Sequence, residues 1–254
     1  MIKITVNADD FGWSESCTKA ICEAFDKGII KTTTMINCGS YADKAYEIAK
    51  SSDLKDFIGI HFDLTEGTPM TDGIRHDPFF CGDDGLFHMR VNRYKKLTAE
   101  QKKHAYDELS AQAEKYCSYG LKIHHADSHH HIHTAPNLFP VFQEIWKEYG
   151  IQKVRISRNI GEISAIKKMA KAAFNSRLKR LGIDYTDYFG SPEECSALNK
   201  DKIKNAAVEL MVHPDLTLDG ALIDRSGEAP YDAPFGKDLA KILEEANDRG
   251  NSLV

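Results

Sequence analysis

The sequence predicts an α/β fold in which parallel strands alternate with helices and curl into a TIM-like (β/α) barrel, in a single domain over residues 1–254. Short apolar runs alternate with longer helical patterns along the chain, which is typical of a parallel sheet covered by helices. Polar motifs follow the apolar runs at 9–10, 61–63, 127–133, 155–158 and 213–215. Because so many strand ends contribute a motif, a barrel is favoured over an open doubly wound sheet.

The elements follow from local patterns. Apolar and polar residues alternate over 2–7, which indicates a strand, and Ser14 is a good cap for a helix ending near Asp26 and Gly28. Further strands are expected at 33–37, 57–62, 121–126, 154–157, 185–189 and 207–212, with a closing strand from 251. Further helices are expected at 41–50, 99–119, 137–148, 162–181 and 235–249. Turn-forming residues predict a long loop excursion around 67–97, of the kind that covers a site, and a second loop at 216–234.

Composition narrows the class of protein. Hydrophobic residues make up 42% and charged residues 28%, which is typical of a soluble globular protein. The formal charge is -5 and basic residues gather only at Lys167–Lys168 and Arg177–Arg180, so nucleic acid is disfavoured as a partner. No apolar run approaches the roughly 20 residues of a membrane span. The first ten residues lack the apolar core of a signal peptide, so we expect a cytoplasmic protein.

Two adjacent carboxylates, Asp9 and Asp10, end the first predicted strand within Asn7-Ala-Asp-Asp-Phe-Gly12. Neighbouring side chains on a strand point to opposite faces, but where the backbone turns at a strand end both can reach one cavity. One carboxylate can then bind a cation while the other takes a proton from water. Taken alone, the pair is more commonly explained by stabilisation of the following helix dipole.

The segment Asp127-Ser-His-His-His-Ile-His133 follows a predicted strand, and with the two histidines just before it holds six of the eleven histidines. Imidazole is a common ligand of zinc and similar ions, so this density predicts a metal site rather than a polar surface loop. His129 and His133 would share one face of a helix. In an extended segment, His129, His131 and His133 would share a face instead.

Four further residues are weaker candidates. His61 ends one apolar run, and His213 ends another just before a proline that stops the strand. A satisfied buried histidine is the usual alternative for each, but His213 is a candidate proton donor. Arg155 and Arg158 are candidate substrate contacts, because guanidinium forks bind anionic or hydroxyl-rich ligands. A solvated salt-bridge pair is the plainer interpretation of these two arginines.

Together, one aspartate and two or three histidines make a site suited to zinc or a similar divalent ion. At these residues the sequence resembles the YdjC-like family of carbohydrate deacetylases, which includes chitooligosaccharide deacetylase. The stretches that carry the resemblance are Asn7–Gly12, Gly59–Thr65, Asp127–His133 and Met211–Pro214. They occur in the expected order and span most of the chain.

The resemblance implies a deformed (β/α) barrel of the NodB-like deacetylase type and a divalent metal ion, Zn²⁺ or Mg²⁺, with two imidazoles favouring zinc. The ligands it implies are Asp10, His61 and His129, with Asp9 as base and His213 as general acid. Asp9 would take a proton from water, and His213 would protonate the leaving amine. The family usually continues past the last helix into a closing strand, whereas this chain stops at Val254, so an incompletely closed barrel is expected.

The expected reaction is removal of the N-acetyl group from an acetylated monosaccharide or oligosaccharide. His131 and His133 are candidates for supporting the ligands or facing the substrate, and Arg155 and Arg158 would suit a phosphorylated saccharide. The sequence is compatible with a homodimer. Two other functions remain as alternatives: a metal-dependent phosphoesterase or amidohydrolase on a related barrel, and a non-catalytic protein that binds sugar or metal.

Overall fold

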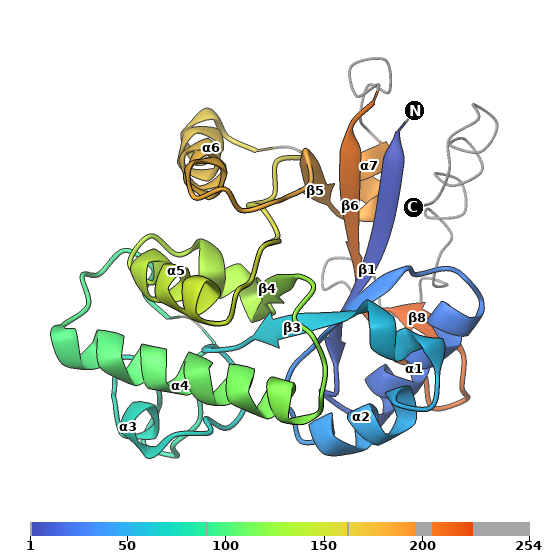
Figure 1. The fold of residues 1–254 in the computed structure, drawn as a ribbon, viewed down its shortest axis with the longest axis horizontal. Coiled ribbons are helices and arrows are strands. Elements are labelled where there is room, and N and C mark those ends of the chain that lie inside the picture. Colours follow the sequence, from blue (N-terminus) through green and yellow to red (C-terminus); the bar gives the residue numbers. More distant parts are fainter. Residues whose placement is uncertain (1, 90, 162, 197–204, 226–254) are drawn as a thin grey trace.

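The computed structural model describes residues 2–89, 91–161, 163–196 and 205–225. Its centre is a six-stranded parallel sheet in the order β4-β3-β2-β1-β6-β5 (Figure 1). The strands are β1 (Lys3–Phe11), β2 (Thr32–Met35), β3 (Ile58–Phe62), β4 (Ala126–Ser128), β5 (Tyr188–Gly190) and β6 (Ala207–Val212). Beyond β4, Arg155 N donates to Ala126 O, and Val154 N donates to Asp184 O close to β5. The sheet therefore curls into a deformed half-barrel with helices around it, which confirms the predicted fold class.

Helices and short turns connect the strands. The α-helices are α1 (Glu15–Asp26), α2 (Ala42–Ala49), α3 (Asp72–Arg75), α4 (Ala99–Ser118), α5 (Phe139–Glu148), α6 (Ala165–Arg180) and α7 (Pro192–Ser196). Two 3₁₀ turns are η1 (Asp53–Phe57) and η2 (His129–Thr134). Helix α4 packs against α5 beside β3 (Figure 1). The buried apolar side chains of these elements form one continuous core, with Phe11, Phe62 and Phe142 fully buried.

Local chemistry explains where the helices begin. Ser14 caps α1, since its hydroxyl accepts a hydrogen bond from Cys17 N at 3.2 Å, as the sequence predicts. Thr98 and Gln101 form a reciprocal capping box at the start of α4. Helix α4 also anchors the excursion at 67–97, because its buried Glu108 accepts hydrogen bonds from backbone N–H groups of Met70 and Thr71. These contacts fix the chain segment that follows β3.

Three strand predictions are wrong in position. The register pairs Ile60 with Ala126, so residues 121–123 precede the first residue of β3 and have no strand to pair with. Only Ala126–Ser128 form β4. The predicted strand at 154–157 forms only isolated bridges at 153 and 154, because its neighbours are short there. The predicted strand at 185–189 is shifted to Tyr188–Gly190.

The predicted loop at 216–234 is also wrong where the structure describes it. Strands β7 (Pro214–Leu216) and β8 (Leu222–Asp224) form an antiparallel hairpin, and β7 packs against α1. Gly220 supplies the positive φ of 83° that the turn requires. The helix expected at 235–249 and the closing strand expected from 251 lie outside the described residues.

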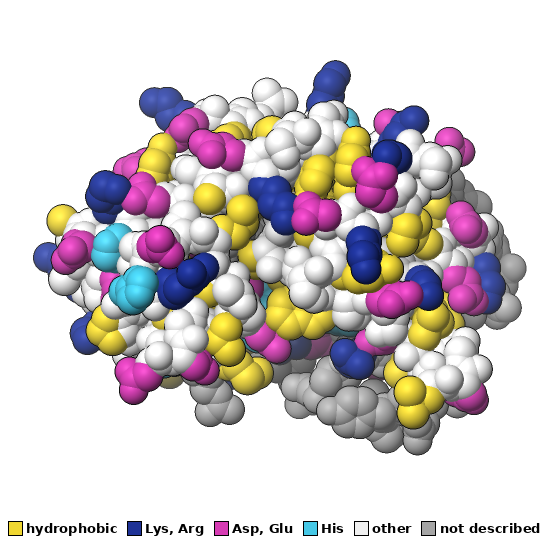
Figure 2. Space-filling view, turned by 90° about the horizontal axis from the view of Figure 1, so that it is seen from below, with side chains coloured by type: hydrophobic (Ala, Val, Ile, Leu, Met, Phe, Trp, Pro, Cys, Tyr) yellow, Lys and Arg dark blue, Asp and Glu magenta, His cyan; other side chains and the backbone are white. Residues whose placement is uncertain are grey.

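Surface charge and helix hydropathy can be compared with the expectation that neither nucleic acid nor a membrane is a partner. On the face shown in Figure 2, acidic and basic side chains are interspersed rather than gathered into patches of one sign. Among the described residues, no helix is both long enough and apolar enough to cross a membrane.

Candidate active site

Asp9 and Asp10 reach the same cavity because β1 is irregular at its carboxyl end. The pairing register between β1 and β2 shifts between Ala8 and Phe11. Asp10 has a φ of 70°, which is left-handed and unfavourable for a residue with a β-carbon. Such backbone strain costs about 1–3 kcal/mol and gathers at functional sites. Both carboxylates line one cavity as a result, although they are neighbours on a strand.

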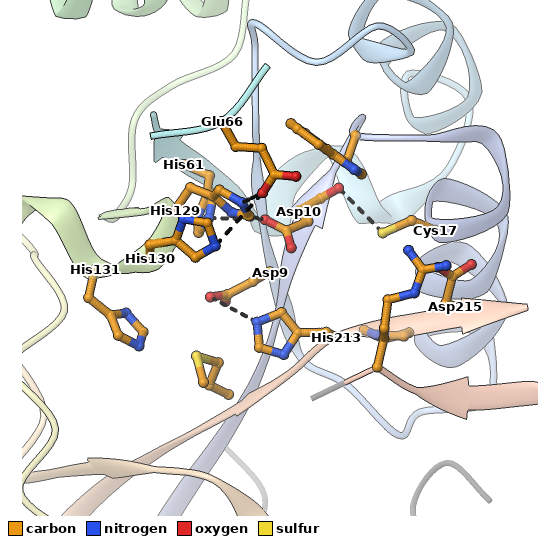
Figure 3. Close-up of a pocket in the computed structure, with 14 residues that line it drawn as sticks. Asp9, Asp10, Cys17, His61, Glu66, His129, His130, His131, His213 and Asp215 are labelled. Carbon is orange, nitrogen blue, oxygen red and sulfur yellow. Dashed lines mark hydrogen bonds and ion pairs between the residues drawn. The ribbon is translucent and has the colours of Figure 1, made fainter. Parts of the chain in front are cut away.

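The histidine-rich segment is neither a regular helix nor an extended strand. His130 and His131 have positive φ values of 48° and 53°, which kink η2. The kink directs His129, His130 and His131 to the cavity (Figure 3) and sends His133 into the core. Neither face suggested by the sequence, His129 with His133 or all three alternate histidines, is formed.

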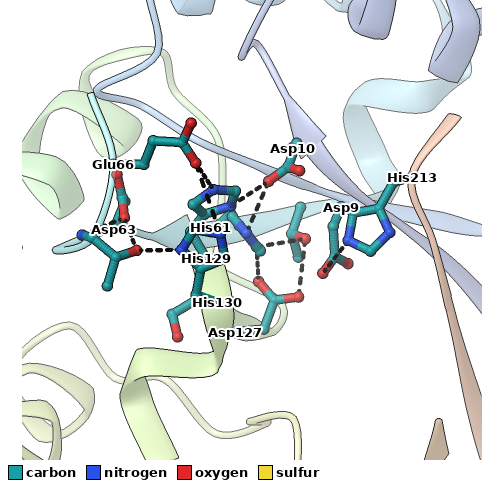
Figure 4. A network of polar contacts seen from close by, with 12 residues as sticks. Asp9, Asp10, His61, Asp63, Glu66, Asp127, His129, His130 and His213 are labelled. Atoms are coloured by element: carbon teal, nitrogen blue, oxygen red, sulfur yellow. Dashed lines mark hydrogen bonds and ion pairs between the residues drawn. The ribbon is translucent and has the colours of Figure 1, made fainter. Parts of the chain in front are cut away.

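Asp10, His61 and His129 converge from three different strand ends (Figure 4). Asp10 Oδ1 lies 3.1 Å from His61 Nε2 and 2.9 Å from His129 Nδ1. His61 Nε2 is buried and makes no hydrogen bond of acceptable geometry within the described residues. One carboxylate and two imidazoles around an unsatisfied nitrogen fit the donor set of a divalent cation such as zinc.

Hydrogen bonds on the side away from Asp10 orient the His61 ring as a metal ligand. Its Nδ1 donates to Asp127 Oδ1 at 2.6 Å, and Thr34 Oγ1 donates to the other oxygen of Asp127 at 3.0 Å. A carboxylate on one imidazole nitrogen leaves the other nitrogen facing the metal position. Burial lowers the pKa of His61, but Asp127 and Asp10 outweigh burial and raise it to about 10. The carboxylates thus favour positive charge here, whether it is a proton or a cation.

Asp9 is paired with a buried guanidinium. Arg155 Nη1 donates to Asp9 Oδ2 and Nη2 donates to Asp9 Oδ1, both at 2.6 Å. The same guanidinium lies 2.7 Å from Asp127 and 2.6 Å from Glu209. Burial raises the pKa of Asp9, but Arg155 outweighs burial and holds that pKa well below its usual range. Asp9 therefore stays ionised, beside the cluster that contains Asp10.

His213 and the cavity complete the geometry. His213 follows β6, and its Nε2 lies 4.0 Å from Asp9 Oδ2. The cavity has a volume of about 630 Å³, which is large enough for a small organic ligand. Its lining residues are Asp9, Asp10, Trp13, Cys17, His61, Glu66, His129, His130, His131, Met211, His213, Pro214, Asp215 and Arg225.

Comparison with known families identifies the kind of protein to which this cavity belongs. The family model described as YdjC-like protein matches residues 3–245. The chain belongs to the YdjC-like family. The matched range contains all the residues that converge on the cavity.

Curated relatives support the same assignment. A carbohydrate deacetylase of Geobacillus stearothermophilus is 31% identical over 219 residues, covering 82% of this chain and 78% of the relative. A carbohydrate deacetylase of Listeria monocytogenes is 31% identical over 215 residues, covering 84% and 81%. One from Vibrio campbellii is 35% identical over 151 residues, covering 59% and 57%.

A solved structure shares the fold of this YdjC-like protein. It is a protein of Enterococcus faecalis V583 described as a candidate for cellobiose-phosphate cleavage. The two structures superpose with a TM-score of 0.71 at 22% sequence identity, covering 99% of this chain and 96% of the other. The likeness supports the α/β barrel-like architecture.

Of the four residues expected to contact the substrate in this YdjC-like protein, one lines the cavity and three lie elsewhere. His131 lines the cavity, and its buried Nδ1 has no partner among the described residues. Arg155 departs from the expectation, because its side chain is only 1% exposed and is bound to three carboxylates behind the cavity. His133 is buried between the Ser128 hydroxyl and the Arg155 carbonyl. Arg158 lines a separate groove and pairs with Glu194.

Sequence reasoning missed several cavity residues. Glu66 Oε2 lies 3.1 Å from His129 Nε2, and Trp13 stacks on the His129 ring with centroids 5.5 Å apart. Both follow strand-end motifs directly, so their position along the chain is a signal that could have found them. Arg225 carried no such signal, because it follows the hairpin that the sequence did not predict.

Proposed function

We propose that this YdjC-like protein is a carbohydrate deacetylase that hydrolyses the N-acetyl group of an acetylated amino sugar or oligosaccharide. One observation carries the proposal. A group of residues that could hold a cation, Asp10, His61 and His129, lines the same cavity as Asp9, whose carboxylate stays ionised. Hydrolysis of an unactivated amide needs a group that stabilises negative charge and a base. An ion held by the cluster would supply the first, and Asp9 is the candidate for the second. The names of the curated relatives support a carbohydrate as substrate.

We propose Asp10, His61 and His129 as the residues that hold the divalent ion. When bound, such an ion would supply a Lewis acid for the acetamide carbonyl and would lower the pKa of water. The two imidazoles favour zinc over magnesium, which prefers oxygen ligands. The hydrogen bond that His61 Nδ1 donates to Asp127 keeps the imidazole ring oriented towards Asp10.

The chain's own residues divide the proton transfers. Asp9 accepts a proton from the attacking water, and Arg155 holds both oxygens of that carboxylate in a fixed plane. His213 lies on the far side of Asp9 from the histidine cluster (Figure 3), where it can donate a proton to the leaving amine. His131 lines the same cavity, and we propose that its side chain contacts the substrate.

The test is acetate release from N-acetylated chitooligosaccharides by metal-stripped protein with and without added Zn²⁺ or Mg²⁺. We expect no release from the stripped protein and recovery with one of the ions. Release of phosphate from sugar phosphates without release of acetate would instead identify a phosphoesterase. Binding of the oligosaccharide with no product under any ion would contradict an enzymatic role.

A further inference from the structure

A second groove of about 430 Å³ lies between α6 and the chain segments 156–159 and 185–187. It shares no lining residue with the candidate active site. Asn175 on α6 ties the helix to the first segment, since its Oδ1 accepts from Ser157 N at 3.0 Å. Asn159 ties the two segments together, since its Nδ2 donates to Asp187 O at 2.8 Å. The walls of the groove are therefore held together by bonds that do not use its charged groups.

The charge of this groove contrasts with the rest of the protein. Arg158, Lys168, Lys171 and Lys179 line it with one acid, Asp187, in a chain of formal charge -5. The guanidinium of Arg158 has an acidic partner, Glu194 at 2.9 Å. In the part of the chain that the structure describes, the three lysines make no salt bridge.

Lys171 shows that this is more than a solvated helix face. The other two lysines are exposed, but Lys171 is half-buried against the groove wall. Burial and the neighbouring Arg158 lower the pKa of its ammonium group. Four cations share this groove with Asp187 and the nearby Glu194. Like charges that outnumber the acids beside them raise the potential in a concave site, and a bound anion would relieve that repulsion.

We propose that this groove binds a phosphomonoester, such as the phosphate group of a sugar phosphate. A phosphomonoester carries close to two negative charges at neutral pH, which matches several unpaired cations better than a single carboxylate does. Three ammonium groups and a guanidinium offer charge-assisted donors to its oxygens. The volume leaves room for a monosaccharide beside the phosphate, with Tyr185 and Ser176 as further polar lining groups.

The test is binding of glucose 6-phosphate and inorganic phosphate to the full-length protein, followed by calorimetry and ³¹P NMR at low ionic strength. The protein is stripped of metal first, so that phosphate cannot bind an ion in the main cavity. Lys171→Met and Lys168→Met should each weaken binding by about tenfold, because each removes one charge-assisted contact. Lys167→Met is the matched control, since Lys167 is an exposed lysine on the same helix that does not line the groove.

Several results would overturn the proposal. One is no saturable binding of either phosphate probe, and another is equal binding of unphosphorylated glucose. An equal loss of phosphate affinity in Lys167→Met and Lys171→Met would show a diffuse effect of charge rather than a specific site. Loss of binding in Arg225→Met alone would place the phosphate in the main cavity. Thermal melts check that each variant is folded, and unchanged acetate release by Lys171→Met separates this site from the proposed catalytic function.

Discussion

Replacing Arg155 with methionine should destabilise the protein strongly and alter the protonation of Asp9. The guanidinium is 1% exposed and contacts Asp9, Asp127 and Glu209 at 2.6–2.7 Å. Methionine has a similar volume but no charge, so three buried carboxylates would lose their shared partner. Breaking one buried ion pair by removing a partner costs about 3–5 kcal/mol, mostly because the remaining charge is left unpaired.

That loss can be measured as a change in the free energy of unfolding or in the melting temperature. For a protein of this size, 3–5 kcal/mol corresponds to a fall in Tm of about 6–20 °C. In the native protein Arg155 keeps the pKa of Asp9 low. Without Arg155, the pKa of Asp9 should rise, and the acidic limb of the activity profile should move to higher pH.

Arg158→Met is the matched control, because Arg158 is three residues away, half-exposed and paired, within the described residues, with a single acid, Glu194. A surface pair of this kind contributes about 0–1 kcal/mol. Urea denaturation of the two variants and the unaltered protein compares them directly. If Arg155→Met lowers the free energy of unfolding no more than Arg158→Met does, the contacts of Arg155 with its three carboxylates do not stabilise the fold.

Three further predictions concern the site and its pH dependence. Asp9→Asn should abolish acetate release while metal content measured by mass spectrometry stays unchanged; full activity would rule out Asp9 as the base. His61→Ala should lower metal content and acetate release together, whereas retention of the ion would show that Asp10 and His129 suffice. His133 is buried, which lowers its pKa from 6.5 to about 3. Between those pH values the unfolded state binds a proton that the folded state does not, so stability is lost as pH falls from 6.5. At pH 5 this loss is about 2 kcal/mol, and His133→Gln should flatten that part of the stability curve measured by urea denaturation.

Much of the fold was predictable because local patterns are strong where helices are capped and strands are continuous apolar runs. Helix α1 is one case, since Ser14 is a good cap in almost any context. Strand β4 shows the limit of such reasoning, because residues 121–123 lie opposite no residue of β3 and strand pairing depends on the neighbour as well as on a segment's own residues. The β7–β8 hairpin was missed because its strands are only three residues long.

The candidate site divides in the same way. Residue type and order along the chain were enough to single out the acidic pair, His61, the histidine-rich segment and His213, since each motif follows an apolar run. The tertiary structure decided which side chains meet. The left-handed backbone at Asp10, His130 and His131 directs carboxylates and imidazoles to one cavity, which strand alternation alone does not predict.

Arg155 is the clearest example of what sequence could not decide. As a residue type it suits a substrate contact, a surface salt bridge and a buried hub equally well. Its role depends on the positions of Asp9, Asp127 and Glu209, which lie on the three strands β1, β4 and β6. The sequence by itself therefore determined the fold class and the chemistry gathered at the strand ends. The resemblance to the YdjC-like family had also implied which groups are ligand, base and acid. The contacts that support those groups, such as the three made by Arg155, depended on through-space distances that only the packed sheet specifies.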